Sequence, residues 1–358
     1  MKNNRYLVTL LIYGTAILLL ILVQVLVSLG CFNALSDQAL EVVGSVLPQL
    51  GVMFGLPLLM LFIVQKTNHG PISVKQITEF VNWRRLSLKN VMLCFILGIC
   101  LYVLNIFIAS VFAAFLQSFG YQFNSNDNVF TGYTGLLISI ILTALLPGIC
   151  EEFLHRGVLL NGLIKQFGVH KAILWSSLLF GLMHMNVGQF FYASILGWFM
   201  GMTALASGSL WGSIIVHFTN NALATYFGYA EELHLPGTGV MSFFFSNGVV
   251  LVLTIIVVVF VIGEILRHMA CDKFKRNLDS YTVRYLASQK HFNVEDFDKL
   301  KMALPAALQT LPTWKATAAY IETFDQPQHS KPLEKALFAM VWVMGIAITM
   351  LSFVWGTW

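Results

Sequence analysis

The sequence predicts an all-α, polytopic transmembrane helical bundle, because three of its features are typical of membrane proteins. Apolar residues make up 57% of the chain and charged residues only 11%, which lies outside the usual range of soluble globular domains. Apolar runs recur along the chain, each close to the roughly 20 residues that cross a hydrocarbon layer as a helix. Most charged residues fall in the connections between these runs and in one late segment.

About nine spans are expected from these runs. They cover residues 6–30, 40–65, 90–117, 135–167, 171–186, 189–208, 210–228, 239–266 and 336–357. The fifth to seventh runs are short and closely spaced, which also fits tilted or re-entrant helices. The chain then divides into N-terminal helices (1–134), a helical core (135–228), a further helix (229–266), a small cytoplasmic helical insert (267–335) and a last span (336–358).

The distribution of basic residues predicts the orientation. Lys2 and Arg5 precede the first span, and five basic residues lie between the second and third, whereas the alternate connections contain no Lys or Arg. By the positive-inside rule the N-terminus is cytoplasmic and, after nine crossings, the C-terminus is extracytoplasmic. The first run is too long for a signal peptide and lacks a small-residue cleavage site, so it should remain as an anchor. We expect an integral protein of a bacterial cell membrane.

The insert has a different composition from the rest of the chain. It holds 11 of the 21 basic residues, and after Asn293 its apolar positions recur three or four residues apart, which predicts a helix that Pro305 breaks. Its expected role is packing, with its basic residues attracted to anionic lipid. No internal repeat, glycine-rich phosphate loop or nucleic-acid-binding signature is present, so we expect a lipid bilayer and no nucleic acid as partner. The oligomeric state is left open.

A cluster of charged residues lies inside the fourth span. Glu151 and Glu152 are followed one helical turn later by Arg156, and Arg156 is the one basic residue that falls outside the predicted cytoplasmic segments. A charged side chain at the centre of a bilayer costs roughly 2.5 to 3.5 kcal/mol even on lenient scales. The cluster therefore needs partners within the membrane or a function there.

Other polar residues on neighbouring spans can supply those partners. His184 lies in the fifth span, and His217 and Asn221 lie in the seventh. Residues four apart share a helix face, so Glu152 can reach Arg156, Glu151 can approach His155, and His217 can align with Asn221. Groups of this kind must turn toward each other or toward a water-filled cavity. Pro147, one turn before Glu151, is expected to kink the helix so that a carbonyl and the carboxylate face that cavity.

This set of side chains fits amide hydrolysis. A carboxylate can take a proton from water that attacks a carbonyl, and an imidazole or an Asn amide can donate to the developing oxyanion. Two histidines with a carboxylate also match the ligands of a catalytic zinc site, so hydrolysis with and without metal stays open. Buried carboxylates and histidines also suit a proton-coupled or cation-coupled transporter, although no inverted repeat supports that function.

The remaining candidates are expected to be structural. The five cysteines show no CxxC spacing, and Cys150 beside the acidic pair is expected to pack as a small hydrophobe and not to act as a nucleophile. The histidines of the predicted loops and of the insert are expected to be solvated. The aromatic clusters 190–192 and 243–245 are expected to face lipid or to pack at the interface.

The ordered motifs resemble a known family. Glu151-Glu152-x-x-x-Arg156, Phe180-x-x-x-His184 and His217-x-x-x-Asn221, each on its own apolar helix, look like the CPBP intramembrane proteases, which include CAAX-prenyl endopeptidases and bacteriocin-processing or immunity proteins. The resemblance covers about residues 135–228. It implies an endopeptidase that acts on a membrane-associated peptide or protein reached from the cytoplasmic side or laterally. A non-catalytic member that acts as an immunity or regulatory protein is the alternative.

The resemblance also implies roles for the motif residues. Glu151 would activate the hydrolytic water, Glu152 and Arg156 would support the site through an ion pair, and His184 would be the second catalytic partner. His217 and Asn221 would stabilise the oxyanion or help to bind a metal, and Phe180 would shape the pocket. If Zn²⁺ is used, its expected ligands are Glu151, His184 and His217. His155 is not a motif position, and its role is left open.

Overall fold

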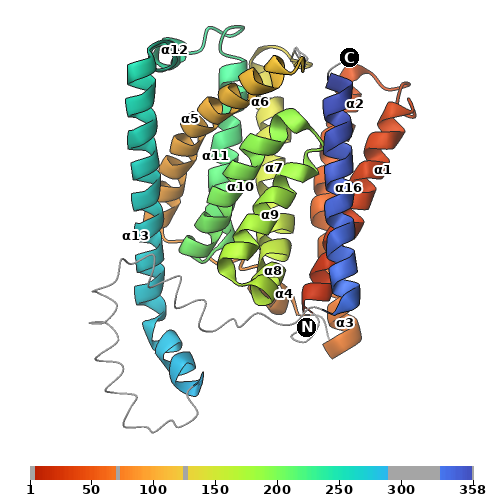
Figure 1. Ribbon diagram of the computed structural model, residues 1–358, viewed down its shortest axis with the longest axis vertical. Helices are drawn as coiled ribbons and strands as arrows, with labels where there is room; N and C mark the ends of the chain where they lie inside the picture. The colour runs from red at the N-terminus through yellow and green to blue at the C-terminus, as the bar shows by residue number, and fades with distance from the viewer. Residues whose placement is uncertain (1–4, 70–72, 124–127, 289–330, 357–358) are drawn as a thin grey trace.

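The chain folds into an elongated bundle of helices (Figure 1). The computed structural model describes residues 5–69, 73–123, 128–288 and 331–356, and within these ranges it contains helices and no strand. The predicted all-α transmembrane bundle is confirmed. The α-helices are α1 (Arg5–Ser28), α2 (Asp37–Val46), α3 (Leu56–His69), α4 (Val74–Phe80), α5 (Leu88–Ser118), α6 (Gly132–Ile140), α7 (Leu146–Glu152), α8 (Asn161–Phe167), α9 (Val169–Met183), α10 (Val187–Ser207), α11 (Leu210–Gly228), α12 (Thr238–Ser246), α13 (Gly248–Ser288) and α16 (Pro332–Gly356).

Three π-helical segments interrupt the second and fourth apolar runs. These are η2 (Leu47–Gly55), η3 (Ile141–Leu145) and η4 (Phe153–Leu160). Pro48 lies in η2, and Pro147 lies just after η3. Proline lacks the N–H that the α-helical ladder needs and crowds the carbonyl four residues earlier, so the regular ladder cannot continue through it. Wider, π-helical turns form next to these two prolines. Such turns are frequent at functional sites.

Each of the nine predicted apolar runs is helical, but seven helical stretches in the described residues are long and apolar enough to cross a membrane. They are α1, α2 to α3, α5, α6 to α8, α10, the first part of α13, and α16. Helix α9 has only 15 residues, and α11, which carries His217 and Asn221, is not among the seven. The predicted number of nine spans is therefore approximate.

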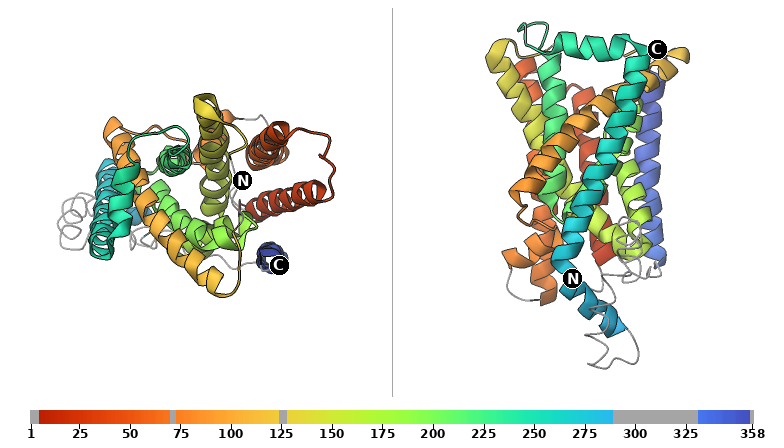
Figure 2. Two further views of the ribbon diagram at one scale, coloured as in Figure 1. Left: turned by 90° about the horizontal axis from the view of Figure 1, so that it is seen from above. Right: turned by 90° about the vertical axis from the view of Figure 1, so that its left-hand side faces the viewer.

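The eighth predicted span, 239–266, differs from the helix that forms. The chain breaks at Asn247, whose extended backbone ends α12 and whose side chain accepts hydrogen bonds from the N–H groups of Val249 and Val250. Such an N-cap starts a new helix, α13, at Gly248. Figure 2 shows α12 lying across the end of the bundle and α13 running along its side. Helix α13 continues to Ser288, and the helix predicted after Asn293 lies outside the described residues.

The basic residues gather at one end of the bundle. Arg5 Nη2 donates to the carbonyl of Phe80 at 2.9 Å, and Lys89 pairs with Asp272 at 3.0 Å, which joins the starts of α1 and α5 to α4 and α13. Ser209, just before α11, donates to the carbonyl of Arg84. Helices α1 and α16 contact each other and run in the same direction, so the two chain ends lie at opposite ends of the bundle (Figure 1).

Helices α9 and α10 cross closely enough to fix the end of α9. A Cβ added at Gly181 would lie 2.6 Å from the carbonyl oxygen of Phe190, so only glycine fits at this crossing. Small residues of this kind let transmembrane helices approach and pack in the absence of a hydrophobic driving force between them. The contact places Phe180 and His184 beside α7 and α11.

Candidate active site

Four polar residues of the three motifs lie around one cavity. The cavity has a volume of about 750 Å³, and Glu151, His184, His217 and Asn221 are among the residues of its wall. Glu151 comes from α7, His184 from the end of α9, and the other two from α11. Three helices that are distant in sequence therefore bring the predicted catalytic groups to the same space.

Glu152 and Arg156 form a buried ion pair behind the cavity wall. Arg156 Nη1 donates to Glu152 Oε1 at 2.6 Å, and the two side chains are 1% and 0% exposed. Arg156 Nη2 also donates to the carbonyl of Gly197 at 2.8 Å, so the guanidinium joins η4 to α10. A buried charge is tolerated when it is paired and hydrogen-bonded. The two charges are paired here, and Glu152 Oε2 and Arg156 Nε are the atoms of the pair without a hydrogen-bond partner among the described residues.

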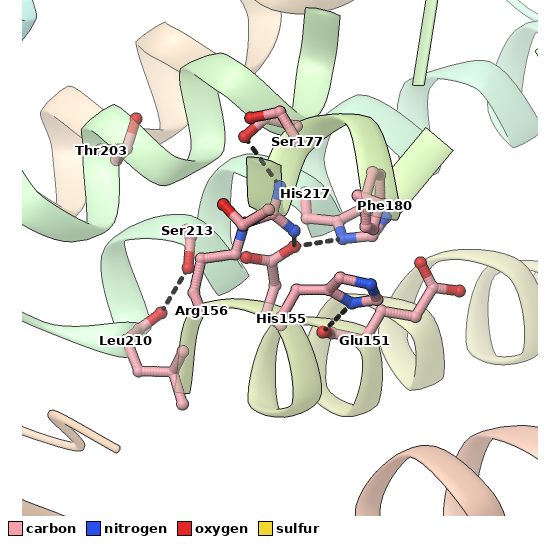
Figure 3. A network of polar contacts seen from close by, with 12 residues as sticks. Glu151, His155, Arg156, Ser177, Phe180, Thr203, Leu210, Ser213 and His217 are labelled. Carbon is pink, nitrogen blue, oxygen red and sulfur yellow. Dashed lines mark hydrogen bonds and ion pairs between the residues drawn. The ribbon is translucent and has the colours of Figure 1, made fainter. Parts of the chain in front are cut away.

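The ring of Phe180 packs among the polar groups of the site. The Arg156 guanidinium lies 4.5 Å from the ring centroid, and the rings of His155, His184 and His217 meet it edge to face at centroid distances of 4.9, 5.1 and 5.8 Å. The ring is 1% exposed. Phe180 thus holds three imidazoles and one guanidinium in place, and the cation over its face is a favourable contact. Figure 3 shows Phe180 together with Arg156, His155 and His217.

The hydrogen bonds around Asn221 fix which nitrogen of His217 carries the proton. Asn221 Nδ2 donates to the carbonyl of Thr143 at 2.9 Å and lies 3.2 Å from His217 Nε2. Since the amide nitrogen can only donate, Nε2 of a neutral His217 is the acceptor. His217 Nδ1 then carries the proton and donates to Glu152 Oε1 at 3.0 Å. One chain of hydrogen bonds runs from Thr143 through Asn221 and His217 to Glu152.

Pro147 explains why the Thr143 carbonyl is available. In an α-helix that carbonyl would accept from the N–H of residue 147, and proline has none. Asn221 from α11 supplies a donor instead, and both Thr143 and Pro147 lie in the cavity wall. The carbonyl that Pro147 leaves without its helical donor is thus bound by Asn221, and the predicted kink stays a prediction.

Glu151 lies apart from this ion-pair network. Figure 3 shows its carboxylate turned away from Arg156 and His217. Its Oε1 accepts from Gln49 Nε2 at 2.8 Å, and its Oε2 is buried without a hydrogen-bond partner among the described residues. The side chain is 7% exposed and lies in the cavity wall. One carboxylate oxygen is thus free to bind a water molecule.

His184 has one nitrogen held and one available. Its Nδ1 donates to the carbonyl of Phe180 at 2.9 Å, so Nε2 of the neutral ring is an acceptor. His184 follows directly on α9 and lies in the wall of the cavity together with Glu151. The ring can therefore accept a proton from a group inside the cavity.

His155 has a structural environment. Its Nδ1 contacts the backbone carbonyl of Glu151 at 2.9 Å and not the carboxylate, and its Nε2 lies 3.2 Å from the Tyr13 hydroxyl. It is fully buried and is not part of the cavity wall. The expected proximity of His155 to Glu151 exists, but it runs through the backbone and joins η4 to α1.

The comparison with known families agrees with this geometry. Residues 133–223 match the family model described as Type II CAAX prenyl endopeptidase Rce1-like. This match supports the resemblance of the core to the CPBP family. The matched segment runs from α6 to α11 and contains every motif residue around the cavity. No curated protein and no solved structure matches the chain significantly. At the level of the family, the chain is related to CAAX-type intramembrane proteases.

The CPBP core does not form a ready-made metal site. Within the described ranges no group of three or more His, Cys, Asp or Glu side chains is placed to hold a metal ion. The expected zinc ligands Glu151, His184 and His217 share the cavity wall, yet His217 Nδ1 is engaged by Glu152 and Nε2 by Asn221. In this arrangement His217 has no free nitrogen for Zn²⁺, and we therefore propose hydrolysis without a metal.

Three residues of the site were not singled out from the sequence. Gln49 binds the carboxylate of Glu151, Thr143 accepts from Asn221, and Asn220, which is 3% exposed, donates to Asn221 Oδ1 at 2.9 Å. Gln49 lies next to Pro48 inside an apolar run, so the signal that could have identified it is a polar residue beside a proline in a span. Its partner is 102 positions away, which no local pattern reveals.

Proposed function

We propose that this chain is an intramembrane endopeptidase in which Glu151 activates a water molecule to hydrolyse a peptide bond of a membrane-associated peptide. The observation that carries the proposal is the unpaired carboxylate oxygen of Glu151 in a cavity that also contains His184 and Asn221. A buried acid with a free oxygen is costly to keep in a membrane unless it has a function. The family match supports the reaction class.

The first step is attack by water. Glu151 Oε2 takes a proton from the water, and the water oxygen forms a bond to the carbonyl carbon of the substrate. Gln49 donates to the other carboxylate oxygen at 2.8 Å, which fixes the orientation of Oε2. The proton held by Glu151 then passes to the leaving nitrogen as the C–N bond breaks, so the carboxylate is regenerated.

The oxyanion that forms on the carbonyl needs a donor, and the Asn221 amide supports this role. Its Nδ2 carries two N–H groups, one bonded to the Thr143 carbonyl and one directed at His217 Nε2, and the second turns from His217 to the oxyanion when substrate is bound. His217 is held in turn by Glu152. A preorganised donor of this kind contributes about 2.7 to 4 kcal/mol in known cases. His217, Glu152 and Arg156 act on the reaction through Asn221 and are positioning residues. His184 Nε2 supplies a second acceptor for the protons of the reaction.

A peptide library tests the proposal. Purified protein in lipid nanodiscs is incubated with the library, and products are identified by mass spectrometry for wild type, Glu151→Ala and His184→Ala. Wild type should cleave a subset of peptides, and both variants should lose that cleavage while their helical content stays unchanged. Folded wild type that cleaves nothing, together with proton-coupled flux in liposomes, would contradict the protease and favour a transporter.

A chelator separates the two forms of hydrolysis. Because the described residues offer no metal cluster, we expect the cleavage rate to stay within experimental error after incubation with a strong zinc chelator. The control is a known zinc peptidase treated in parallel. Loss of cleavage that added Zn²⁺ restores would show that the metal-free mechanism is wrong.

A further inference from the structure

We propose that the peptide reaches Glu151 from the end of the bundle that contains no Lys or Arg, and that Glu41 at the mouth of the cavity selects a positively charged stretch of that peptide. This inference rests on the proposed peptidase function and adds a direction of entry and a substrate property. It differs from the cytoplasmic or lateral entry expected from the family resemblance.

The cavity extends from Glu151 in one direction only. On α11 its wall begins at His217 and ends at Gly228, and on α10 it runs from Gln189 to Leu196, which is the first half of that helix. Since α10 and α11 start at opposite ends of the bundle, these two stretches share the end where α10 starts and α11 finishes. On α5 the wall residues lie between positions 102 and 109, far from the start of that helix at the basic end. They therefore lie toward the same, non-basic end.

The other direction is closed. The fully buried pair of Glu152 and Arg156 comes next along the fourth span, and the segment after Glu152 is buried from Phe153 through Leu163. Asn161 fills the layer below by donating to the carbonyls of Phe80, Arg156 and Gly157 at 3.2, 3.1 and 2.8 Å. No residue of this layer lies in the cavity wall. A peptide cannot pass from the basic end to Glu151 through this packing.

A second cavity continues the path outward. It has a volume of about 680 Å³ and shares Thr143, Ala224, Thr225 and Gly228 with the first. Its wall also contains Glu41 near the start of α2, residues 128–130 before α6, and Tyr229 after α11. The two cavities together connect Glu151 with the loops at the non-basic end.

The mouth of this path is negatively charged. Glu41 of α2 lies in the cavity wall, Asp37 begins the same helix, Glu231 and Glu232 follow α11, and segments 29–46 and 228–247 contain no Lys or Arg. Glu232 is engaged by the backbone N–H of Gly132 at 2.7 Å, whereas exposed Glu41 has no ion-pair partner within the described part of the chain. A cationic peptide segment would provide one. Under the positive-inside rule this end is extracytoplasmic, so the substrate is a peptide presented on the outer side.

The interior of the path contains hydrogen-bond acceptors that a polar chain can bind. Glu151 Oε2, Gln49 Oε1 and Asn220 Oδ1 are buried without hydrogen-bond partners among the described residues, and all three side chains lie in the cavity wall and are more than nine-tenths buried. Acceptors left unpaired inside a protein are costly. The N–H groups of a peptide backbone, or water, would satisfy them.

Labelling of single cysteines tests on which side of the membrane the path opens, without any need for activity. In a variant whose five native cysteines are replaced by Ala, Glu41→Cys is compared with Glu79→Cys, an exposed position at the basic end. A membrane-impermeant maleimide added to intact cells should label Glu41→Cys and should label Glu79→Cys only after permeabilisation. The reverse pattern would overturn the inference and leave the proposed peptidase intact.

Charge reversal tests the selectivity. Paired peptides that differ only by Lys or Gln on one side of the scissile bond are compared with wild type, Glu41→Lys and the matched control Glu79→Lys. We expect Glu41→Lys to reduce kcat/KM for the Lys peptide roughly fivefold at low salt, with no change for the Gln peptide and a smaller effect at high salt. Equal kinetics of Glu41→Lys and wild type on both peptides would overturn the selectivity. If wild type cleaves no peptide, the proposed function fails, and the labelling still decides the direction of access.

Discussion

At the scale of single residues, two neighbouring carboxylates have different surroundings. Each has one oxygen without a hydrogen-bond partner among the described residues, but Glu152 lies outside the cavity wall with its Oε1 bound to Arg156 and His217, whereas Glu151 lies in that wall. Consecutive residues of a helix point in different directions, so Glu152 faces the buried ion pair and Glu151 faces the cavity. We propose a structural role for Glu152 and a chemical role for Glu151. Substitutions at the two positions should therefore change different observables.

Glu152→Gln should destabilise the protein, because it leaves the buried Arg156 guanidinium without a counter-charge. Removal of one partner from a buried ion pair typically costs about 3 to 5 kcal/mol. Thermal or denaturant unfolding in detergent measures this loss. The double variant Glu152→Gln with Arg156→Met should regain part of it, and Lys89→Gln at the exposed pair with Asp272 should cost less than about 1 kcal/mol. Wild-type stability of the single variant would contradict the assignment.

Residue spacing identified much of this site. The i to i+4 rule placed Arg156 on Glu152 and Asn221 beside His217, and both contacts are present. The rule also placed His155 near Glu151, but the contact is to the backbone carbonyl, since the π-helical turns of η4 begin just after Glu152. Gln49 could not be found in this way, because its contact with Glu151 depends on the packing of η2 against α7.

At the scale of the elements, interruptions of the helices create the site. Pro147 leaves the carbonyl of Thr143 without its helical donor, and Asn221 crosses from α11 to bind it. The π-helical segments on both sides of α7 adjust the turn on which Glu151 lies. The sequence indicated the kink through Pro147, but not the three π-helical segments, because their wider turns leave no characteristic residue pattern.

Pro147→Ala should stabilise the helix and slow the reaction. The new N–H of residue 147 can bond to Thr143 and compete with Asn221, which loses the anchor that orients it. We expect a loss of roughly tenfold or more in kcat with little change in KM, since the donor acts on the transition state. The control is Pro57→Ala, in α3 and outside the cavity wall. An unchanged kcat in folded Pro147→Ala would show that Pro147 has no effect on catalysis.

At the scale of the whole molecule, the basic residues and the opening of the cavity lie at opposite ends of the bundle. Basic residues concentrate at the end where α1 begins, and the cavity extends to the other end. Composition predicted the bundle, because it depends on the hydrocarbon layer, whereas the orientation inferred from the basic residues stays a prediction. The direction of the cavity could not be predicted, because it depends on which helix halves leave space between them after packing.

The orientation itself can be measured with reporters at the two ends of the chain. A periplasmic-active enzyme fused after residue 358 should be active, and the same enzyme fused before residue 1 should be inactive, because α1 and α16 run in parallel from the basic end. A cytoplasmic-active reporter should give the reverse pattern and serves as the control. Equal activity of one reporter at both ends would contradict the arrangement of these two helices.

The proposed catalytic role of Glu151, as distinct from the structural role of Glu152, is tested most directly by one variant. The single-turnover cleavage rate of Glu151→Gln is measured in lipid nanodiscs together with its melting temperature. The isosteric amide keeps the size of the side chain and the contact with Gln49 but cannot take a proton from water. We predict a fall of about 10²-fold to 10⁴-fold in the cleavage rate, the usual range for general-base catalysis. The melting temperature should stay close to that of wild type. Folded Glu151→Gln that cleaves at the wild-type rate would contradict the catalytic role of Glu151.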